Sequence, residues 1–324
     1  MSNQNIKIKD FTIIIPCISF KDVKNCIENI RKIYKKIKII ISLNKLINIK
    51  NKDKNLKIII SKYDSIGKKR NIAVNNCKTK YLAFIDSDAY PEKNWIESSF
   101  RYLKRKNVGI VSGPHIDPPD QNYFQKIIGS VKKSFLITMK PNLQKNNKKE
   151  TAQFTSFIPS ANWILSKKIF NSLKQMDENM LRNEDWDFVY NKMKKTNYKL
   201  LYSPNTLVYH NNGTIFHFIK KRFLYGFYMW PILMKLNLQN YYFFLPLIFV
   251  IFLISFPFTF FLKFYSMFYF IVLSVYIIVV LWESLRLSKN LIDFLFIFPT
   301  LICAIISPGV GILLGFYNYI KNKI

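Results

Sequence analysis

The stretch YLAFIDSDAY, residues 81–90, decides how the rest of the sequence is interpreted. It begins with a short apolar run suited to a buried strand and ends with two carboxylates, Asp86 and Asp88. Side chains two residues apart in an extended chain point to the same side. The two carboxylates can therefore converge on one cation. A solvated turn is the plainer interpretation of such a pair alone, but its position after a buried strand favours a site.

The residues before this stretch alternate between strand-like and helix-like patterns. Apolar runs at 11–16, 37–43 and 56–61 predict strands, and the spacing within 21–36 and 67–77 predicts helices. This alternation is typical of an α/β domain with a parallel sheet and right-handed crossovers. Ligands of such sheets bind beyond the carboxyl ends of the strands, where Asp86 and Asp88 are expected.

Composition narrows the class of protein. Half of the 324 residues are hydrophobic, and the net charge is +30, much of it from lysines among many Ile and Asn residues, as an AT-rich genome also produces. Nucleic-acid binding is not predicted, because the sequence contains no RNP-like, zinc-finger or helix-turn-helix pattern. The four cysteines show no metal spacing and predict free, reduced thiols. The first ten residues lack an apolar signal core, so nothing indicates secretion.

Composition changes sharply at Tyr241. Runs of about the 20 apolar residues that a bilayer span needs predict spans at 241–262 and 264–282 and a third apolar segment at 291–317. The third segment either spans the membrane or is a re-entrant or interfacial segment. A break at 307–309 (Ser-Pro-Gly) is favoured because it keeps the last lysines inside. The positive charges at 220–222, 235, 286 and 289 place the N-terminal domain on the cytoplasmic side, as expected for an integral protein of a bacterial inner membrane.

Four blocks, in order, carry a resemblance to a known family: FTIIIP (11–16), GKKRNIAVNNCKTKYLAFIDSD (67–88), the 159–188 block containing NEDWDF, and LLYSPNTLVYH (200–210). Over nearly all of residues 10–215 the chain resembles the GT-A glycosyltransferases of the family 2 type. The resemblance implies an α/β, Rossmann-like nucleotide-diphospho-sugar transferase domain at 1–215. An amphipathic interfacial linker at 216–240 and a membrane region at 241–324 with transmembrane helices would follow. The loop 114–150 is expected to cover the acceptor site.

The resemblance also implies roles for the acidic residues. Asp88 would bind Mn²⁺ or Mg²⁺, and Asp86 would face the nucleotide ribose or support the metal from outside its direct ligands. Asp185 would be the general base, with Glu184 and Asp187 as neighbouring acids. Acids at a helix start also stabilise the helix dipole, which alone explains many such pairs.

Five further residues complete the expected site. His210 would contact the metal or the diphosphate, although a plain surface histidine fits nearly as well. Arg70 and Asn71 would meet the nucleotide-sugar donor, unless they lie on a solvated helix face. Pro16 ends the opening strand and is grouped with the donor site. Asn162 is expected in the acceptor region.

Two departures from the family pattern bear on specificity. Asn44 stands where relatives carry aspartates that read the nucleobase, so it is the candidate base contact. No Q-x-x-R-W run is present, which favours a single transfer over processive synthesis. We therefore expect a membrane-anchored, inverting, metal-dependent transferase acting on a lipid-linked or cell-surface glycan acceptor, with membrane lipid as a partner.

Three alternatives stay open. A polyprenyl-phosphate sugar could replace the nucleotide donor. A non-catalytic membrane scaffold could carry a degenerate domain, which the altered residue 44 permits. A nucleotidyltransferase could use a similar fold, but PCISFKD (16–22) lacks the Gly-rich loop expected after its first strand.

Overall fold

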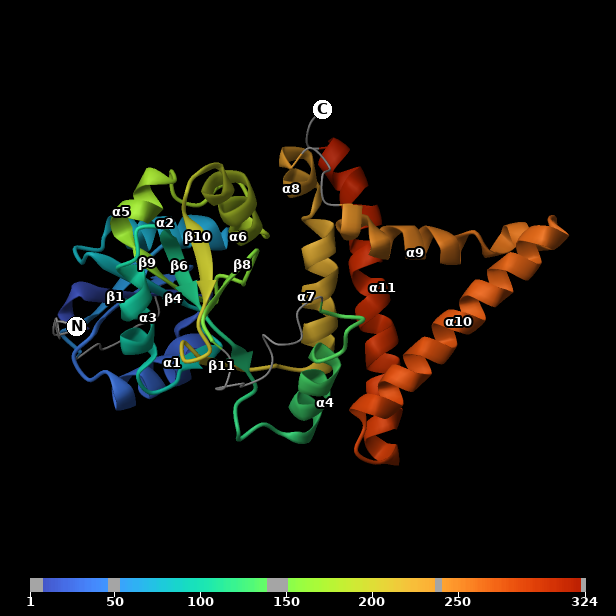
Figure 1. Ribbon diagram of the computed structural model, residues 1–324, viewed down its shortest axis with the longest axis horizontal. Helices are drawn as coiled ribbons and strands as arrows, with labels where there is room; N and C mark the ends of the chain where they lie inside the picture. Colours follow the sequence, from blue (N-terminus) through green and yellow to red (C-terminus); the bar gives the residue numbers. More distant parts are fainter. Residues whose placement is uncertain (1–7, 46–52, 139–150, 237–240, 322–324) are drawn as a thin grey trace. The chain divides into compact units, whose positions relative to one another are not determined.

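The computed structural model describes residues 8–45, 53–138, 151–236 and 241–321 (Figure 1). The chain divides into two compact units. The first contains Met1–Pro118 and Asn142–Asn211, and the second contains Pro119–Pro141 and Asn212–Ile324. Part of the loop expected over the acceptor site therefore groups with the C-terminal helices. The Lys-rich end of that loop, 139–150, lies outside the described residues.

The first unit is built on a mixed sheet whose described strands follow the order β3-β2-β1-β4-β9-β6-β10-β8. Parallel pairs join β3 to β2, β2 to β1, β1 to β4 and β6 to β10. Strand β9 runs antiparallel between β4 and β6, and β8 is antiparallel to β10. The strands are β1 Phe11–Pro16, β2 Lys38–Leu43, β3 Leu56–Ile60, β4 Tyr81–Ile85, β6 Val108–Ser112, β8 Gln153–Thr155, β9 Asn162–Ser166 and β10 Lys199–Tyr202.

Helices cover this sheet because its strands are apolar on both faces. Strands β1 and β4 are buried along almost their whole length, as their continuous apolar runs predicted, and so is β6, which the sequence analysis did not identify. One buried cluster joins β1 and β2 to α1, and another joins β4 and β9 to α2 and α5. The helices of this unit are α1 Phe20–Ile33, α2 Ile66–Asn75, α3 Trp95–Leu103, α5 Lys167–Ser172, α6 Glu184–Trp186 and the π-helix η3 Asp187–Lys192.

A small second sheet lies in the first unit, with the order β5-β11-β7. Its strands are β5 Ala89–Pro91, β7 His115–Ile116 and β11 Val208–His210. Strand β11 pairs antiparallel with β5, so that His210 lies opposite Ala89. This pairing brings the end of the domain back to the residues that follow the DSD stretch. The α/β fold class is confirmed, with β9 as an antiparallel strand that the alternation had not indicated.

The second unit consists of helices: α4 Tyr123–Lys132, α7 Ile215–Phe227, α8 Trp230–Lys235, α9 Leu245–Ile254, α10 Lys263–Leu287 and α11 Leu291–Lys321. Among the described residues, α10 and α11 are long and apolar enough to cross a bilayer. A third apolar helix, α9, is shorter. Helix α11 packs against α4, α7, α9 and α10 and so organises this unit.

The segment expected as the first span, 241–262, does not form one helix in the described part of the chain. Helix α9 ends at Ile254, and a 3-10 turn, Phe256–Phe260, follows. Pro257 has no N–H for the carbonyl of Leu253, which instead accepts from the Tyr269 hydroxyl at 3.3 Å. The proline therefore ends the α-helix, and α10 supplies the missing hydrogen bond.

Helix α11 is continuous through 307–309, where a break was expected. Pro308 deprives the carbonyl of Ala304 of its helical N–H donor. The Nε of Arg222 on α7 donates to that carbonyl at 2.5 Å. A neighbouring helix thus satisfies the freed backbone group, which is how prolines are tolerated within long apolar helices.

Candidate active site

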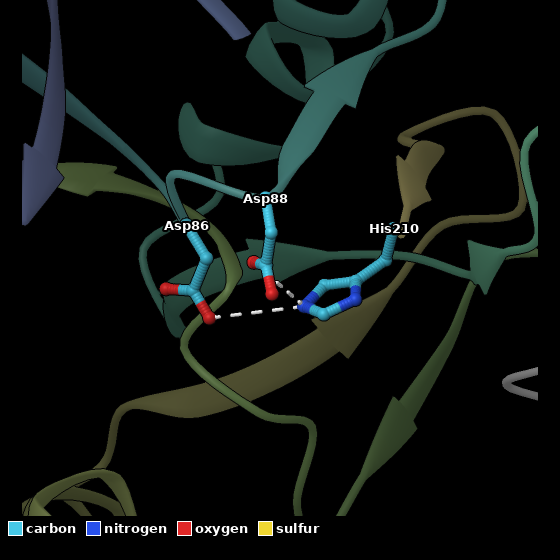
Figure 2. Close-up of side chains that lie close together, drawn as sticks. All are labelled: Asp86, Asp88 and His210. Atoms are coloured by element: carbon cyan, nitrogen blue, oxygen red, sulfur yellow. Dashed lines mark ion pairs between the residues drawn. The ribbon is translucent and has the colours of Figure 1, made fainter. Parts of the chain in front are cut away.

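Asp86, Asp88 and His210 converge at the end of β4 (Figure 2). One ligand atom from each lies within 4.8 Å of the other two. The Nε2 of His210 is 3.4 Å from Oδ1 of Asp88 and 3.9 Å from Oδ2 of Asp86. The β5–β11 pairing causes this convergence, and the N–H of Asn211 secures it by donating to the Asp88 carbonyl at 2.9 Å.

This cluster is chemically suited to a small divalent cation. Two carboxylates and an imidazole supply oxygen and nitrogen donors, a combination suited to Mn²⁺ and compatible with Mg²⁺. The side chains of Asp86 and Asp88 remain about one-third exposed, at 33% and 37%, so a ligand can reach them. The structure therefore brings together Asp88 and His210, the predicted metal ligands, with Asp86, which was expected to face the ribose or to support the metal.

Arg70 is a buried link between this cluster and the acids of α6. Its side chain is 1% exposed, and its two terminal nitrogens lie 2.9 Å from Asp86 Oδ1 and 2.9 Å from Glu184 Oε1. A longer contact of 3.5 Å reaches the carbonyl of Ser160. Since its terminal nitrogens hold two carboxylates, Arg70 positions both acids. Direct contact with a donor stays a prediction.

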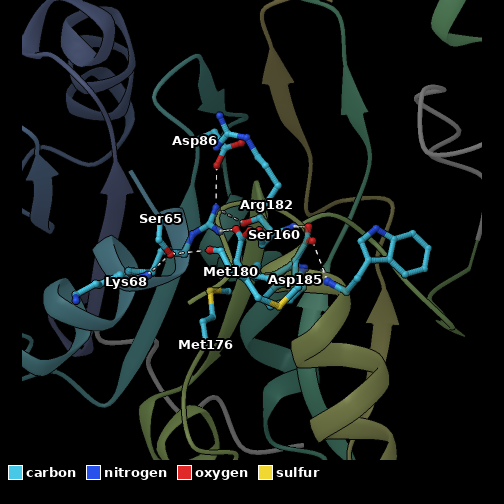
Figure 3. Close-up of polar contacts among 12 residues, drawn as sticks. Ser65, Lys68, Asp86, Ser160, Met176, Met180, Arg182 and Asp185 are labelled. Atoms are coloured by element: carbon cyan, nitrogen blue, oxygen red, sulfur yellow. Dashed lines mark hydrogen bonds and ion pairs between the residues drawn. The ribbon is translucent and has the colours of Figure 1, made fainter. Parts of the chain in front are cut away.

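The acids Glu184 and Asp185 begin α6 after a sharp backbone turn. Asn183 has φ 64°, in the left-handed region that asparagine tolerates better than most residues. Glu184 is buried, and burial raises its pKa from 4.5 to about 7; the charge of Asp185 adds to this and Arg70 opposes it. Asp185 accepts hydrogen bonds from the N–H groups of Ser160 (3.2 Å) and Trp186 (2.8 Å) (Figure 3).

Burial also raises the pKa of Asp185, although the Ser160 N–H and Arg70 act in the opposite direction. A carboxylate that is partly buried, held by two backbone donors and more basic than usual can accept a proton. The role of general base for Asp185 stays a prediction. Asp187, by contrast, is fully buried and accepts from Asn191 at 3.1 Å, a contact that stabilises the start of η3.

Helix α2 holds the segment that leads into α6. Asn71 donates to the Met176 carbonyl at 2.9 Å and accepts from the Met176 N–H at 3.1 Å. Gly67 permits the close approach, because a Cβ there would meet Glu184 at 3.2 Å and the Asp177 carbonyl at 3.0 Å. Asn71 therefore anchors this segment through its amide, and a donor contact for it stays a prediction.

Asn162 and Pro16 occupy buried positions near the sheet edge. Asn162 is fully buried, accepts from the Trp95 indole at 2.8 Å and donates to the Thr206 carbonyl at 2.6 Å. These bonds tie β9 to α3 and to the segment before β11. Pro16 ends β1 opposite Ser42. Contact of either residue with a substrate stays a prediction.

The structure adds Asp64, which the sequence analysis did not select. The Asn44 amide donates to Asp64 Oδ1 at 3.1 Å, and Asn44 Oδ1 is a buried acceptor without a hydrogen-bond partner in the described part of the chain. Asn44 also lines a cavity of about 590 Å³ together with Lys45, Ile60 and Lys62. Asp64 lies just after β3, as Asn44 lies just after β2. This position beyond the carboxyl end of a strand was the sequence feature that could have identified Asp64 as a site residue.

The sequence of this chain matches the model of glycosyl transferase family 2 over residues 12–174, just over half of its 324 residues. The chain therefore belongs to glycosyl transferase family 2, as the four sequence blocks indicated. The match covers the main sheet from β1 to β9 and the DSD stretch, and it ends before Asp185 and His210.

Curated relatives include the pre-mycofactocin glycosyltransferases of the CDC 1551 and H37Rv strains of Mycobacterium tuberculosis. They are 24% identical over 161 residues, which is 48% of this chain and 32% of theirs. This chain thus aligns with about a third of the length of these relatives.

Similar solved structures include S. aureus TarS 1-349, with 14% identity and a TM-score of 0.45 over 67% of this chain and 64% of that one. GalNAc-T7 with UDP, GalNAc and Mn²⁺ is another, with 12% identity and a TM-score of 0.47 over 67% and 50%.

Proposed function

We propose that this protein is a membrane-associated glycosyltransferase that moves one sugar from a nucleotide-sugar donor to an acceptor hydroxyl with inversion. The observation that carries the proposal is the convergence of Asp86, Asp88 and His210 at the end of β4, in a chain of this family. The buried Arg70 connects this cluster to the α6 acids, so metal-binding and proton-accepting groups belong to one network.

The donor site is proposed at the carboxyl ends of β1, β2 and β3. Ligands of parallel sheets bind at such ends. Asn44 Oδ1 offers a buried acceptor, and Asp64 places a carboxylate beside it, which suits the N–H edge of a nucleobase. The departure at residue 44 therefore does not leave the pocket without polar groups, which supports a nucleotide donor over a degenerate scaffold.

Asp86, Asp88 and His210 would hold a divalent cation, because their donor atoms lie close together and two of the three side chains are about one-third exposed. When bound, Mn²⁺ or Mg²⁺ would neutralise negative charge on the diphosphate. Arg70 limits the freedom of Asp86 by holding one oxygen of its carboxylate, which leaves the other facing His210.

Asp185 would take the proton of the acceptor hydroxyl. The hydroxyl oxygen forms the new bond to the anomeric carbon as the bond to the diphosphate oxygen breaks, and the nucleoside diphosphate leaves with that electron pair. A single displacement inverts the anomeric centre. The N–H groups of Ser160 and Trp186 orient the Asp185 carboxylate, and its raised pKa makes it a better base than an exposed aspartate.

The acceptor is proposed to be a lipid-linked or cell-surface glycan, because the second unit carries α10 and α11, two apolar helices of bilayer-spanning length. The catalytic unit would lie on the cytoplasmic side of a bacterial inner membrane, where nucleotide sugars are made. A polyprenyl-phosphate sugar is the alternative donor, and it would not need the Asn44–Asp64 pocket.

The experiment is a thermal-stability screen of the purified full chain with UDP, GDP, CDP and dTDP, each with and without Mn²⁺. A ligand that binds only the folded state stabilises it by about 2.7 kcal/mol at a hundred times its dissociation constant. We expect one nucleotide to raise the melting temperature in the presence of metal. Asp88→Ala should abolish this shift, and Ser87→Ala, the residue between the two aspartates, should retain it.

Two results would contradict the proposal. Stabilisation by a nucleotide that persists in Asp88→Ala would show that the cluster does not take part in donor binding. No stabilisation by any nucleotide, with or without metal, would favour the polyprenyl-phosphate donor or the scaffold. Release of nucleoside diphosphate from the matching nucleotide sugar then tests catalysis, and Asp185→Asn should lose that release while retaining the thermal shift.

A further inference from the structure

Helix α7 carries three consecutive cations in its centre and packs against the middle of α11. Lys220, Lys221 and Arg222 lie in the centre of α7, and Arg222 Nε donates to the Ala304 carbonyl at 2.5 Å. Just beyond α7, the Trp230 indole donates to the Ile312 carbonyl at 2.8 Å. The two helices therefore run in the same direction, with fixed registration.

Glycines bring the two helices into backbone contact. A Cβ on Gly226 would collide with the backbone of Pro308, and a Cβ on Gly311 would collide with that of Phe223. Gly315 faces the backbone of Phe227 in the same way. Such contact leaves no room for sliding, so in a spanning orientation the centre of α7 would lie at the same depth as the middle of α11.

This shared depth conflicts with a spanning orientation of α11. The helix has 31 residues and is about 46 Å long, longer than a hydrocarbon core of about 30 Å. Ala304 lies about 20 Å from its start, by the same rise per residue. In a spanning orientation centred on α11, the cations of α7, including the exposed Lys220, would lie well inside the hydrocarbon, where charged groups are strongly disfavoured.

The surface of α11 is divided into two faces. Its covered face includes Ile297, Leu301, Ala304 and Ile312, which pack within the unit. The exposed residues of α11 from Leu291 to Ile320 are apolar, and among its exposed residues only the terminal Lys321 is charged. This gives α11 the apolar face that an interfacial helix requires. At helical spacing this face presents Ile292, Leu295, Phe296, Leu313, Leu314, Tyr317 and Ile320.

Helix α10 differs because it is covered far less: 11% of its most apolar stretch is buried within the unit, against 39% for α11. Large apolar side chains remain exposed along α10, among them Phe264, Phe268, Ile271, Val275 and Ile278, and such a surface suits contact with hydrocarbon. We propose that α7 and α11 form a layer lying along the membrane surface, with the α7 cations at the depth of anionic headgroups, and that the α9–α10 hairpin is the part that enters the hydrocarbon core.

The test is the sidedness of the two ends of α11. Lys289 precedes the helix and Lys321 is its last residue, and both are exposed. Lys289→Cys and Lys321→Cys are placed separately in a Cys303→Ser background, because the other three cysteines are buried. Native membrane vesicles of both orientations are treated with a membrane-impermeant maleimide. Lys93→Cys, exposed in the first unit, reports the side of the catalytic domain.

We expect Lys289→Cys, Lys321→Cys and Lys93→Cys to be labelled in the same vesicle orientation. Labelling of Lys289→Cys and Lys321→Cys in opposite orientations would overturn the proposal. Protection of Lys321→Cys in both orientations, relieved only by detergent, would overturn it too. Labelling in detergent shows that each introduced cysteine is reactive, and an unchanged melting temperature in detergent shows that each variant is folded. The outcome does not depend on transfer activity, so it can fail while the proposed function holds.

Discussion

Arg70 offers the sharpest test of the site, because one buried guanidinium holds two carboxylates from different parts of the chain. Arg70→Met removes the partner of Glu184 and of Asp86 while keeping most of the side-chain volume. Breaking a buried ion pair from one side costs about 3–5 kcal/mol. Glu184 accounts for most of this cost, since Asp86 is one-third exposed and solvent screens it.

The loss of stability caused by Arg70→Met should depend on pH, and the pKa of Glu184 determines whether it increases or decreases as pH rises. Burial raises that pKa from 4.5 to about 7, so the fold favours the neutral carboxyl. The resulting stability is fully present below about pH 4.5 and is lost as pH rises through 7. Without Arg70, the charged form is opposed even more strongly. Arg70→Met should therefore be more destabilising at pH 8 than at pH 5.

The assay is thermal unfolding of the full chain in detergent at a fixed scan rate, followed by tryptophan fluorescence. A loss of about 3–5 kcal/mol corresponds to a fall of roughly 6–20 °C in melting temperature for a domain of this size. Adding Glu184→Gln to Arg70→Met should recover part of the loss, because no charge is then left buried. Arg101→Met, at an exposed arginine, should change stability by less than about 0.5 kcal/mol.

A loss below about 1 kcal/mol, or a loss equal at pH 5 and pH 8, would refute this reasoning. Either result would mean that Glu184 does not depend on Arg70 for its charge. Arg70 would then be free for the donor contact that the family resemblance implies.

Three further predictions concern the proposed base Asp185, the close contact between Gly67 and Glu184, and the packing of α7 against α11. Asp185→Asn should lower kcat/KM by about 10²- to 10⁴-fold. Because the pKa of Asp185 is raised, the wild-type activity should fall on the acid side at a higher pH than an ordinary aspartate would give. A fall at the pH of an ordinary aspartate would contradict the role of Asp185 as the base. Gly67→Ala should cost about 1–3 kcal/mol through overpacking against Glu184, and a neutral result in thermal unfolding would show that the segment can move. Arg222→Leu should cost about 1–3 kcal/mol by leaving the Ala304 carbonyl unpaired. Pro308→Ala restores a backbone N–H donor for that carbonyl, so Arg222→Leu should lower the melting temperature much less when Pro308→Ala is present. An equal loss with and without Pro308→Ala would contradict the pairing of Arg222 with Ala304.

The sequence alone determined the α/β class and the family. Buried strands are recognisable as apolar runs, and polar residues immediately after such a run lie at a sheet edge, so the positions of Asp86 and Asp88 follow from the residues around them. Local patterns of this kind depend on a few neighbouring residues. Local patterns also located the apolar C-terminal region, because a run of about 20 apolar residues can be recognised from the sequence alone.

Only the tertiary structure decided which distant residues meet. His210 lies close to Asp88 because β11 pairs with β5, although more than a hundred residues separate them in the sequence. The alternation of strands and helices predicted parallel strands and therefore did not predict the antiparallel β9. Arg70 resembled a solvated helix residue, yet it is buried between two carboxylates. The Ser-Pro-Gly sequence at 307–309 predicted a break, but Arg222 supplies the hydrogen bond that Pro308 removes. Each outcome depends on a partner far away in the chain, and local sequence does not encode the identity of that partner.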